Sequence, residues 1–60
     1  MNNKYKILVI EDDKNISELL TALLETNNYA VVTADSCKSG IMMFTSHRPD
    51  LVILDLGLPD

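Results

Sequence analysis

Three short runs of consecutive apolar residues alternate with two segments in which apolar residues recur every three or four positions. The runs cover residues 7–10, 29–34 and 51–54. Unbroken runs rich in Val, Ile and Leu are typical of strands that are buried on both faces of a parallel sheet. The pattern therefore predicts three strands, each followed by polar residues.

The segment after the first run predicts an amphipathic helix. Either Asp12 or Asp13 can cap its first turn, where acidic charge also suits the positive end of the helix dipole. Residues 26–28 can end it, because Asn accepts the left-handed backbone of a helix C-terminus. The expected apolar stripe, at helical spacing, consists of Ile16, Leu19, Leu20, Leu23 and Leu24.

A second helix is predicted over residues 37–46. Gly40 costs about 1 kcal/mol relative to Ala within a helix, which indicates either a close approach to the sheet or a weak helix. We expect Cys37 to be a small core residue and not a redox centre. The expected apolar stripe is Cys37, Ile41 and Phe44, widened by Met42 or Met43 as gap-filling core.

Both ends of this helix carry recognisable signals. Asp35 and Ser36 are good N-caps. His47 and Arg48 place positive charge at the negative end of the helix, and Pro49 stops it. No second ligand stands at metal-binding spacing from His47, so we interpret it as a cation at a helix end.

Strands that alternate with short helices predict an α/β fold with a parallel sheet and right-handed crossovers. The carboxyl ends of parallel strands meet at one edge of the sheet, so Glu11, Asp12 and Asp55 should share that edge. If the first and third strands are neighbours, the three residues converge at the switch point where open α/β sheets bind ligands.

Three convergent carboxylates repel one another unless a cation neutralises them. Mg²⁺ is a suitable cation, since it binds one or two carboxylates while keeping waters and substrate phosphate. A carboxylate such as Asp55 can also act as a nucleophile in aspartyl-phosphate chemistry. The simpler alternatives are that Glu11, Asp12 and Asp13 form a solvated helix cap and that Asp55 only ends a strand.

Composition narrows these possibilities. The 60 residues carry a formal net charge of −4, which disfavours direct contact with nucleic acid. A single cysteine cannot form a disulfide within the chain. The first apolar run is too short for a signal peptide or a membrane span. We therefore expect a cytoplasmic protein that does not contact membranes.

The residues 7–13, Ile-Leu-Val-Ile-Glu-Asp-Asp, and 50–60, Asp-Leu-Val-Ile-Leu-Asp-Leu-Gly-Leu-Pro-Asp, resemble the receiver domain of two-component response regulators. The resemblance implies a flavodoxin-like (CheY-like) fold with strand order 2-1-3-4-5. It also implies that Asp55 accepts a phosphoryl group from a sensor histidine kinase. Mg²⁺ would then be bound by Glu11, Asp12, Asp55 and the backbone carbonyl of Gly57.

The sequence of residues 55–60 further resembles that of transcription factors of the OmpR/PhoB type, including potassium-transport regulators. The resemblance implies that the protein acts on DNA through an output domain. Receivers also carry a hydroxyl residue after the fourth strand and a Lys after the fifth. The 60 residues predict only the first three strands, so neither of these residues is among them. We therefore expect residues 1–60 to be the N-terminal half of a receiver domain. Alone it should be a poor phosphoacceptor, not an enzyme, and should associate with itself through its exposed third strand.

Two other functions compete with this interpretation. A Mg²⁺-dependent phosphohydrolase also uses an Asp nucleophile at a strand end, but usually has a second Asp two residues later, where this chain has Gly57. The second competing function is that of an interaction module that associates with itself and catalyses no reaction. A nucleotide-binding domain is disfavoured, because no glycine-rich loop follows the first strand.

Overall fold

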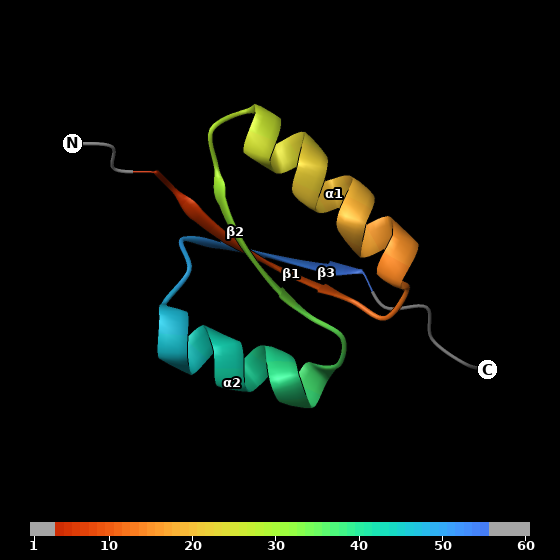
Figure 1. Ribbon diagram of the computed structural model, residues 1–60. Helices are drawn as coiled ribbons and strands as arrows, with labels where there is room; N and C mark the ends of the chain where they lie inside the picture. Colours follow the sequence, from red (N-terminus) through yellow and green to blue (C-terminus); the bar gives the residue numbers. More distant parts are fainter. Residues whose placement is uncertain (1–3, 56–60) are drawn as a thin grey trace.

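The chain alternates strand and helix throughout residues 4–55, which are the residues that the computed structural model describes. The elements form a parallel sheet with one helix on each face (Figure 1). In chain order they are β1 (Lys6–Glu11), α1 (Lys14–Thr26), β2 (Ala30–Ala34), α2 (Cys37–His47) and β3 (Leu51–Asp55). All five predicted elements are present, and each boundary lies within one or two residues of its prediction.

The strand order is β2-β1-β3, and both neighbours run parallel to β1. The order expected from the resemblance is therefore confirmed for these three strands. Because β1 is central and has a helix on each side, its apolar residues form the core of the described chain. Leu8 and Val9 are 1% and 0% exposed, and Ile7 and Ile10 are also buried.

Local hydrogen bonds explain where α1 begins and ends. The Asp13 carboxylate accepts hydrogen bonds from the backbone N–H groups of Asn15 and Ile16, at 2.9 and 3.2 Å, so it caps the first turn as predicted. Asn27 is the C-cap, and Asn28 follows in the left-handed region with a φ of 68°. The predicted roles of Asp13 and of the Asn pair are confirmed.

Helix α2 begins with a capping box. The Ser36 hydroxyl accepts from the Ser39 backbone N–H at 3.1 Å, and the Ser39 hydroxyl accepts from the Ser36 N–H at 3.2 Å. The helix ends at His47, and Arg48 takes a left-handed conformation with a φ of 49°. Pro49 follows, as expected of a residue that cannot continue a helix.

The connection from α2 to β3 is bonded to the start of β1. The Lys6 backbone N–H donates to the Asp50 carboxylate at 2.8 Å, and the Asp50 N–H donates to the Lys6 carbonyl at 2.7 Å. The Lys6 ammonium also donates to the carbonyl of His47 at 3.0 Å. These bonds fix where β3 enters the sheet. They therefore also fix the register of β1 and β3 as far as their carboxyl ends, where Glu11 pairs with Asp55.

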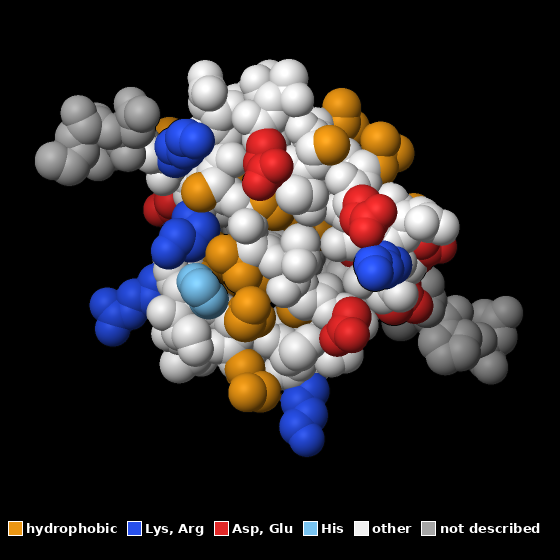
Figure 2. Space-filling view, viewed as in Figure 1, with side chains coloured by type: hydrophobic (Ala, Val, Ile, Leu, Met, Phe, Trp, Pro, Cys, Tyr) orange, Lys and Arg blue, Asp and Glu red, His pale blue; other side chains and the backbone are white. Residues whose placement is uncertain are grey.

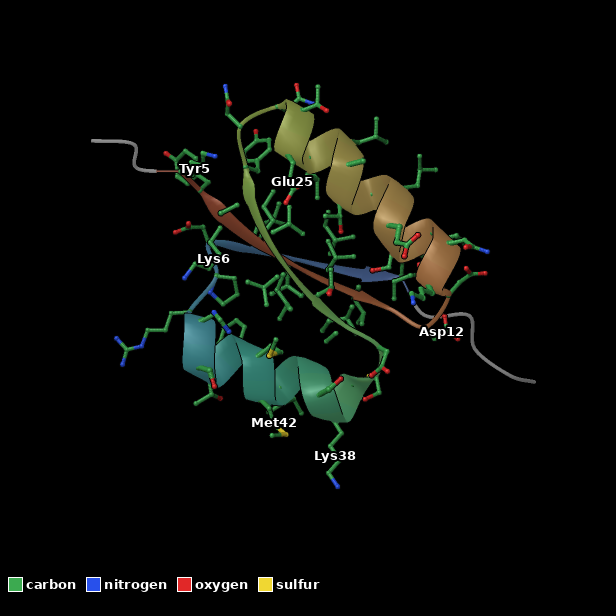
Figure 3. The ribbon with its side chains drawn as sticks, in the orientation of Figure 1. Tyr5, Lys6, Asp12, Glu25, Lys38 and Met42 are labelled. Atoms are coloured by element: carbon green, nitrogen blue, oxygen red, sulfur yellow. The ribbon has the colours of Figure 1, made fainter. Side chains whose placement is uncertain are left out.

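The predicted inward face of α2 is only partly correct, because Met43 packs on the core as expected but the other members of the stripe do not. Ile41 and Phe44 are 68% and 52% exposed, and Cys37 is exposed and not a core residue. Met42 is also exposed, and Figure 3 shows it directed away from the sheet. The face toward the sheet contains Gly40, which is buried, and Met43, which packs on the core.

Gly40 lies against the side chain of Ile10. A β-carbon built at Gly40 would overlap the Cδ1 atom of Ile10 and lie 2.9 Å from its Cγ1 atom. The backbone of α2 therefore comes so close to the Ile10 side chain that any larger residue at position 40 would require this side chain to shift. Of the two alternatives raised by the sequence, the close approach is confirmed.

Replacing Gly40 with Ala is expected to lower the free energy of unfolding by about 1 kcal/mol. Overpacking against Ile10 should exceed the gain in helix propensity that Ala brings. Urea unfolding should show a smaller loss in an Ile10→Val background, where the Cδ1 atom is gone. Equal losses in both backgrounds would contradict the close contact.

Helix α1 and strand β3 also leave apolar side chains exposed within the described residues. In α1, Leu20 and Leu24 are half-buried as predicted, whereas Ile16, Leu19 and Leu23 are exposed. As expected of an exposed third strand, β3 lies at the margin of the sheet in the described residues, and only Ile53 is half-buried. The exposed residues of β3 are Leu51, Val52, Leu54 and Asp55. Self-association through this strand stays a prediction.

Candidate phosphoacceptor and metal site

Acidic residues meet at the carboxyl edge of the sheet. Glu11 is the last residue of β1 and Asp55 the last residue of β3, and the two are direct partners in the parallel pairing. Adjacent strands lie about 4.8 Å apart, so the two backbones are close neighbours at this edge. Asp12 follows Glu11 at the same end of the sheet (Figure 3).

These residues line one open depression, together with Asp13 and Ile16. The sequence therefore placed Glu11, Asp12 and Asp55 together correctly. Gly57, the fourth predicted ligand, lies outside the described residues, and its role stays a prediction.

Glu11 is the unusual member of this group because it is buried, with 4% of its surface exposed. Its Oε2 atom accepts a hydrogen bond from the Asp13 backbone N–H at 3.0 Å. Its Oε1 atom is buried and receives no hydrogen bond from any described residue. A buried carboxylate oxygen without a partner is unfavourable, so this atom is suited to a ligand that supplies positive charge.

The pKa of Glu11 reflects the same surroundings. The hydrogen bond from the Asp13 backbone lowers it, but burial, the side chains of Asp12 and Asp55, and the charge of Asp55 raise it. The net effect is a pKa above the ordinary glutamate value. Glu11 is therefore ionised at a free-energy cost when no cation is present.

Replacing Glu11 with Gln is expected to stabilise the fold at pH 7 in the absence of divalent cations. Since the folded-state pKa is raised, the folded protein binds more protons than the unfolded chain between the two pKa values. The wild-type protein therefore loses stability as the pH rises through this range. The amide keeps the hydrogen bond to Asp13 without the charge.

Urea unfolding at several pH values should show the advantage of the Gln variant shrinking as the pH falls below the raised pKa. An Asp35→Asn variant, which removes an exposed carboxylate after β2, is the matched control and should not show this pattern. A Gln variant that is less stable than the wild type at pH 7 would contradict the cost assigned to Glu11.

The donor atoms fit a hard divalent cation. All three side chains offer carboxylate oxygens, which Mg²⁺ prefers, and the unpartnered Oε1 of Glu11 lies among them. Within residues 4–55, no three His, Cys, Asp or Glu side chains are gathered in a ready-made metal site. The side chains present would therefore need to adjust around the ion.

Sequence reasoning missed the burial of Glu11 and its hydrogen bond to Asp13. The available signal was its position as the last residue of the central strand. A side chain there lies beside the last residue of β3 and close to the helix that starts immediately afterwards.

Comparison with known proteins agrees with this geometry. Residues 7–60 match the family model of the response regulator receiver domain. This match covers most of the chain, which therefore belongs to the response regulator receiver domain family of two-component signalling.

Among its relatives is the transcriptional regulatory protein KdpE of Staphylococcus aureus, 46% identical over 55 residues, or 92% of this chain and 24% of the relative. The KDP operon transcriptional regulatory protein KdpE of Escherichia coli is 39% identical over 54 residues, 90% of this chain and 24% of its own length. The alkaline phosphatase synthesis transcriptional regulatory protein PhoP of Bacillus subtilis is 39% identical over 54 residues, covering 90% and 22%.

The chain spans about a quarter of the length of these curated relatives. The expected resemblance to transcriptional regulators of this type is thereby confirmed, and the relatives include two proteins named KdpE. In the described part of the chain, neither helix has the length and apolar character needed to cross a membrane.

Proposed function

We propose that Asp55 accepts a phosphoryl group from a sensor histidine kinase in a Mg²⁺-dependent reaction. The observation that carries this proposal is the pairing of Asp55 with Glu11 at the carboxyl edge of the sheet, with Asp12 beside them. A nucleophilic carboxylate that shares an edge with two further carboxylates suits phosphoryl transfer, which depends mainly on positioning and charge neutralisation. Membership of the receiver family supports the same role.

In the proposed reaction, one carboxylate oxygen of Asp55 attacks the phosphorus atom of a phosphohistidine. The phosphorus–nitrogen bond breaks, the imidazole leaves and takes up a proton, and an acyl phosphate forms on Asp55. Glu11, Asp12, Asp55 and the carbonyl of Gly57 would hold Mg²⁺. The bound ion would neutralise the carboxylates and the phosphoryl oxygens. The pairing of β3 with β1 places the attacking residue beside Glu11.

The remaining parts of the proposal concern the whole protein. We infer that phosphorylation controls an output domain that binds DNA in the cytoplasm, since the relatives are named as transcriptional regulators. The charge of −4 on this chain supports DNA contact through another part of the protein. The receiver promotes its own phosphorylation and is not an enzyme acting on a separate substrate.

The test uses the protein at the full length that its gene encodes. Incubation with acetyl phosphate and Mg²⁺ should add one phosphoryl group per molecule, detected by intact mass. Peptide mapping should place it on Asp55, and hydroxylamine should remove it, because it is an acyl phosphate. Omitting Mg²⁺ or adding a chelator should abolish incorporation. Labelling of another residue, or equal labelling without a divalent cation, would overturn the proposal.

A further inference from the structure

An open trough runs along β2, between α1 on one face of the sheet and α2 on the other. Figure 1 shows both helices flanking this strand. Strand β2 forms the floor of the trough. The sides of α1 and α2 that face β2 form its two walls. The lining residues that the following argument uses are Val31 and Thr33 from β2, Glu18 and Glu25 from α1, and Asp35 and Met43 from the α2 side.

The floor of the trough has an unpaired strand edge within residues 4–55. Strand β2 pairs with β1 on one side only, and no described residue pairs with its other side. An edge strand leaves backbone N–H and C=O groups free to pair with another extended chain. Natural edges are often blocked by charged residues or proline, but β2 has the sequence Ala-Val-Val-Thr-Ala. Its edge is therefore open to strand addition.

The two walls of the trough differ in chemistry. The α1 wall carries the carboxylates of Glu18 and Glu25, and Figure 3 shows Glu25 extending from the last turn of α1 toward β2. The α2 wall offers the half-buried, apolar side chain of Met43, with the carboxylate of Asp35 at its end. Figure 2 shows carboxylates above and to the right of the centre of this face, with a basic side chain between two of them. Among the described residues that line the trough, Lys14 is the single base.

We propose that this trough binds an extended, positively charged peptide segment, which adds to the sheet as a strand beside β2. Side chains of a strand alternate between its two faces. Cationic side chains at every second position would therefore reach Glu18 and Glu25 on α1. Apolar side chains at the positions between them would lie against Met43 on α2. The trough ends at Glu11 and Asp12, which also line the depression around Asp55, but the proposed peptide contacts lie further along β2.

The charge complementarity favours such a peptide over a second copy of this chain. Glu18 and Glu25 are seven residues apart on α1, about 10 Å along the helix, so one extended peptide of five or six residues spans both. A second copy would bring its own net charge of −4 toward these carboxylates. Repulsion between like charges would weaken that association.

The experiment titrates the full natural-length protein with a fluorescent eight-residue peptide of alternating lysine and valine, followed by fluorescence anisotropy. Binding should be saturable and should weaken with added salt. Two control peptides should fail to bind. One has glutamate in place of lysine, and the other carries N-methyl groups on alternate backbone amides, which removes the donors needed for strand pairing.

Two double variants with the same change in net charge locate the site. Glu18→Gln with Glu25→Gln removes two negative charges from the trough and should weaken peptide binding by about threefold or more. Leu19→Lys with Met42→Lys adds two positive charges at exposed positions outside the trough and should change binding by less than twofold. Both pairs lie on helix surfaces, and circular dichroism checks that each variant is folded.

Amide chemical shifts provide the structural readout. Peptide binding should shift the amide signals of residues 30–34 and slow hydrogen exchange along β2. Equal binding of the N-methylated peptide would show charge attraction without strand addition and would overturn the proposal. Equal affinities of the two double variants, or shifts confined to other elements, would also overturn it. So would concentration-dependent dimerisation that shifts the β2 amides without peptide, since the occupant would then be a second copy.

Discussion

Replacing Asp55 with Asn should reduce phosphoryl incorporation from acetyl phosphate by on the order of a hundredfold or more, the scale expected when a nucleophile is removed. The amide has nearly the same shape as the carboxylate but is a far weaker nucleophile, and it removes one negative charge from a proposed cation site. Because Asp55 is exposed at the end of β3, the substitution should leave the fold intact. Phosphate-affinity electrophoresis and intact mass measure the loss.

The matched control is Asp35→Asn, which removes a carboxylate from the same edge of the sheet but after β2 instead of β3. Asp35 does not line the depression that contains Asp55. This variant should keep incorporation within about twofold of the wild-type level. Similar losses in both variants would mean that the total acidic charge of the edge matters, and that Asp55 has no special role.

Replacing Leu8 with Ala is expected to destabilise the fold by about 2–5 kcal/mol. Leu8 is 1% exposed in the middle of β1, between two paired strands, and belongs to the main apolar cluster. The surrounding strands cannot collapse into the cavity without losing their own pairing. Small domains are marginally stable, so this loss could leave the described segment largely unfolded.

Leu19→Ala is the control for this prediction, because it removes the same atoms from a side chain that is 60% exposed on α1. It should change the free energy of unfolding by about 0.5 kcal/mol or less. Urea unfolding followed by circular dichroism measures both variants in the full natural-length protein. Comparable losses for Leu8 and Leu19 would show that β1 is not the main core of this part of the protein.

The strand–helix order and the helix ends could be predicted from sequence because they depend on local chemistry. Asp13 and Ser36 are capping residues wherever they occur next to a helical segment, and Asn28 accepts positive φ. The sequence also predicted that Glu11 and Asp55 lie at the same edge of the sheet, since this requires only that the strands are parallel. These features need no knowledge of how the helices pack.

The inward face of α2 was predicted only in part, because it depends on a contact between distant residues. Periodicity favoured Ile41 and Phe44, but the close approach of Gly40 to Ile10 turns Gly40 and Met43 toward the sheet. A similar limit applies to Glu11, whose burial results from its neighbours in three dimensions. The ligand role of Gly57 and the extent of the domain beyond the described residues stay predictions.

The hydrogen bonds between Lys6 and Asp50 have a consequence for how this domain tolerates changes in length. They lie at the opposite end of the β1–β3 pair from Glu11 and Asp55, five positions earlier along the chain in each case. Inserting or deleting one residue between α2 and β3 would shift β3 by about 3.3 Å and turn each of its side chains to the opposite face. Asp55 would then face away from Glu11. This short connection should therefore keep its length among proteins that retain the acidic edge.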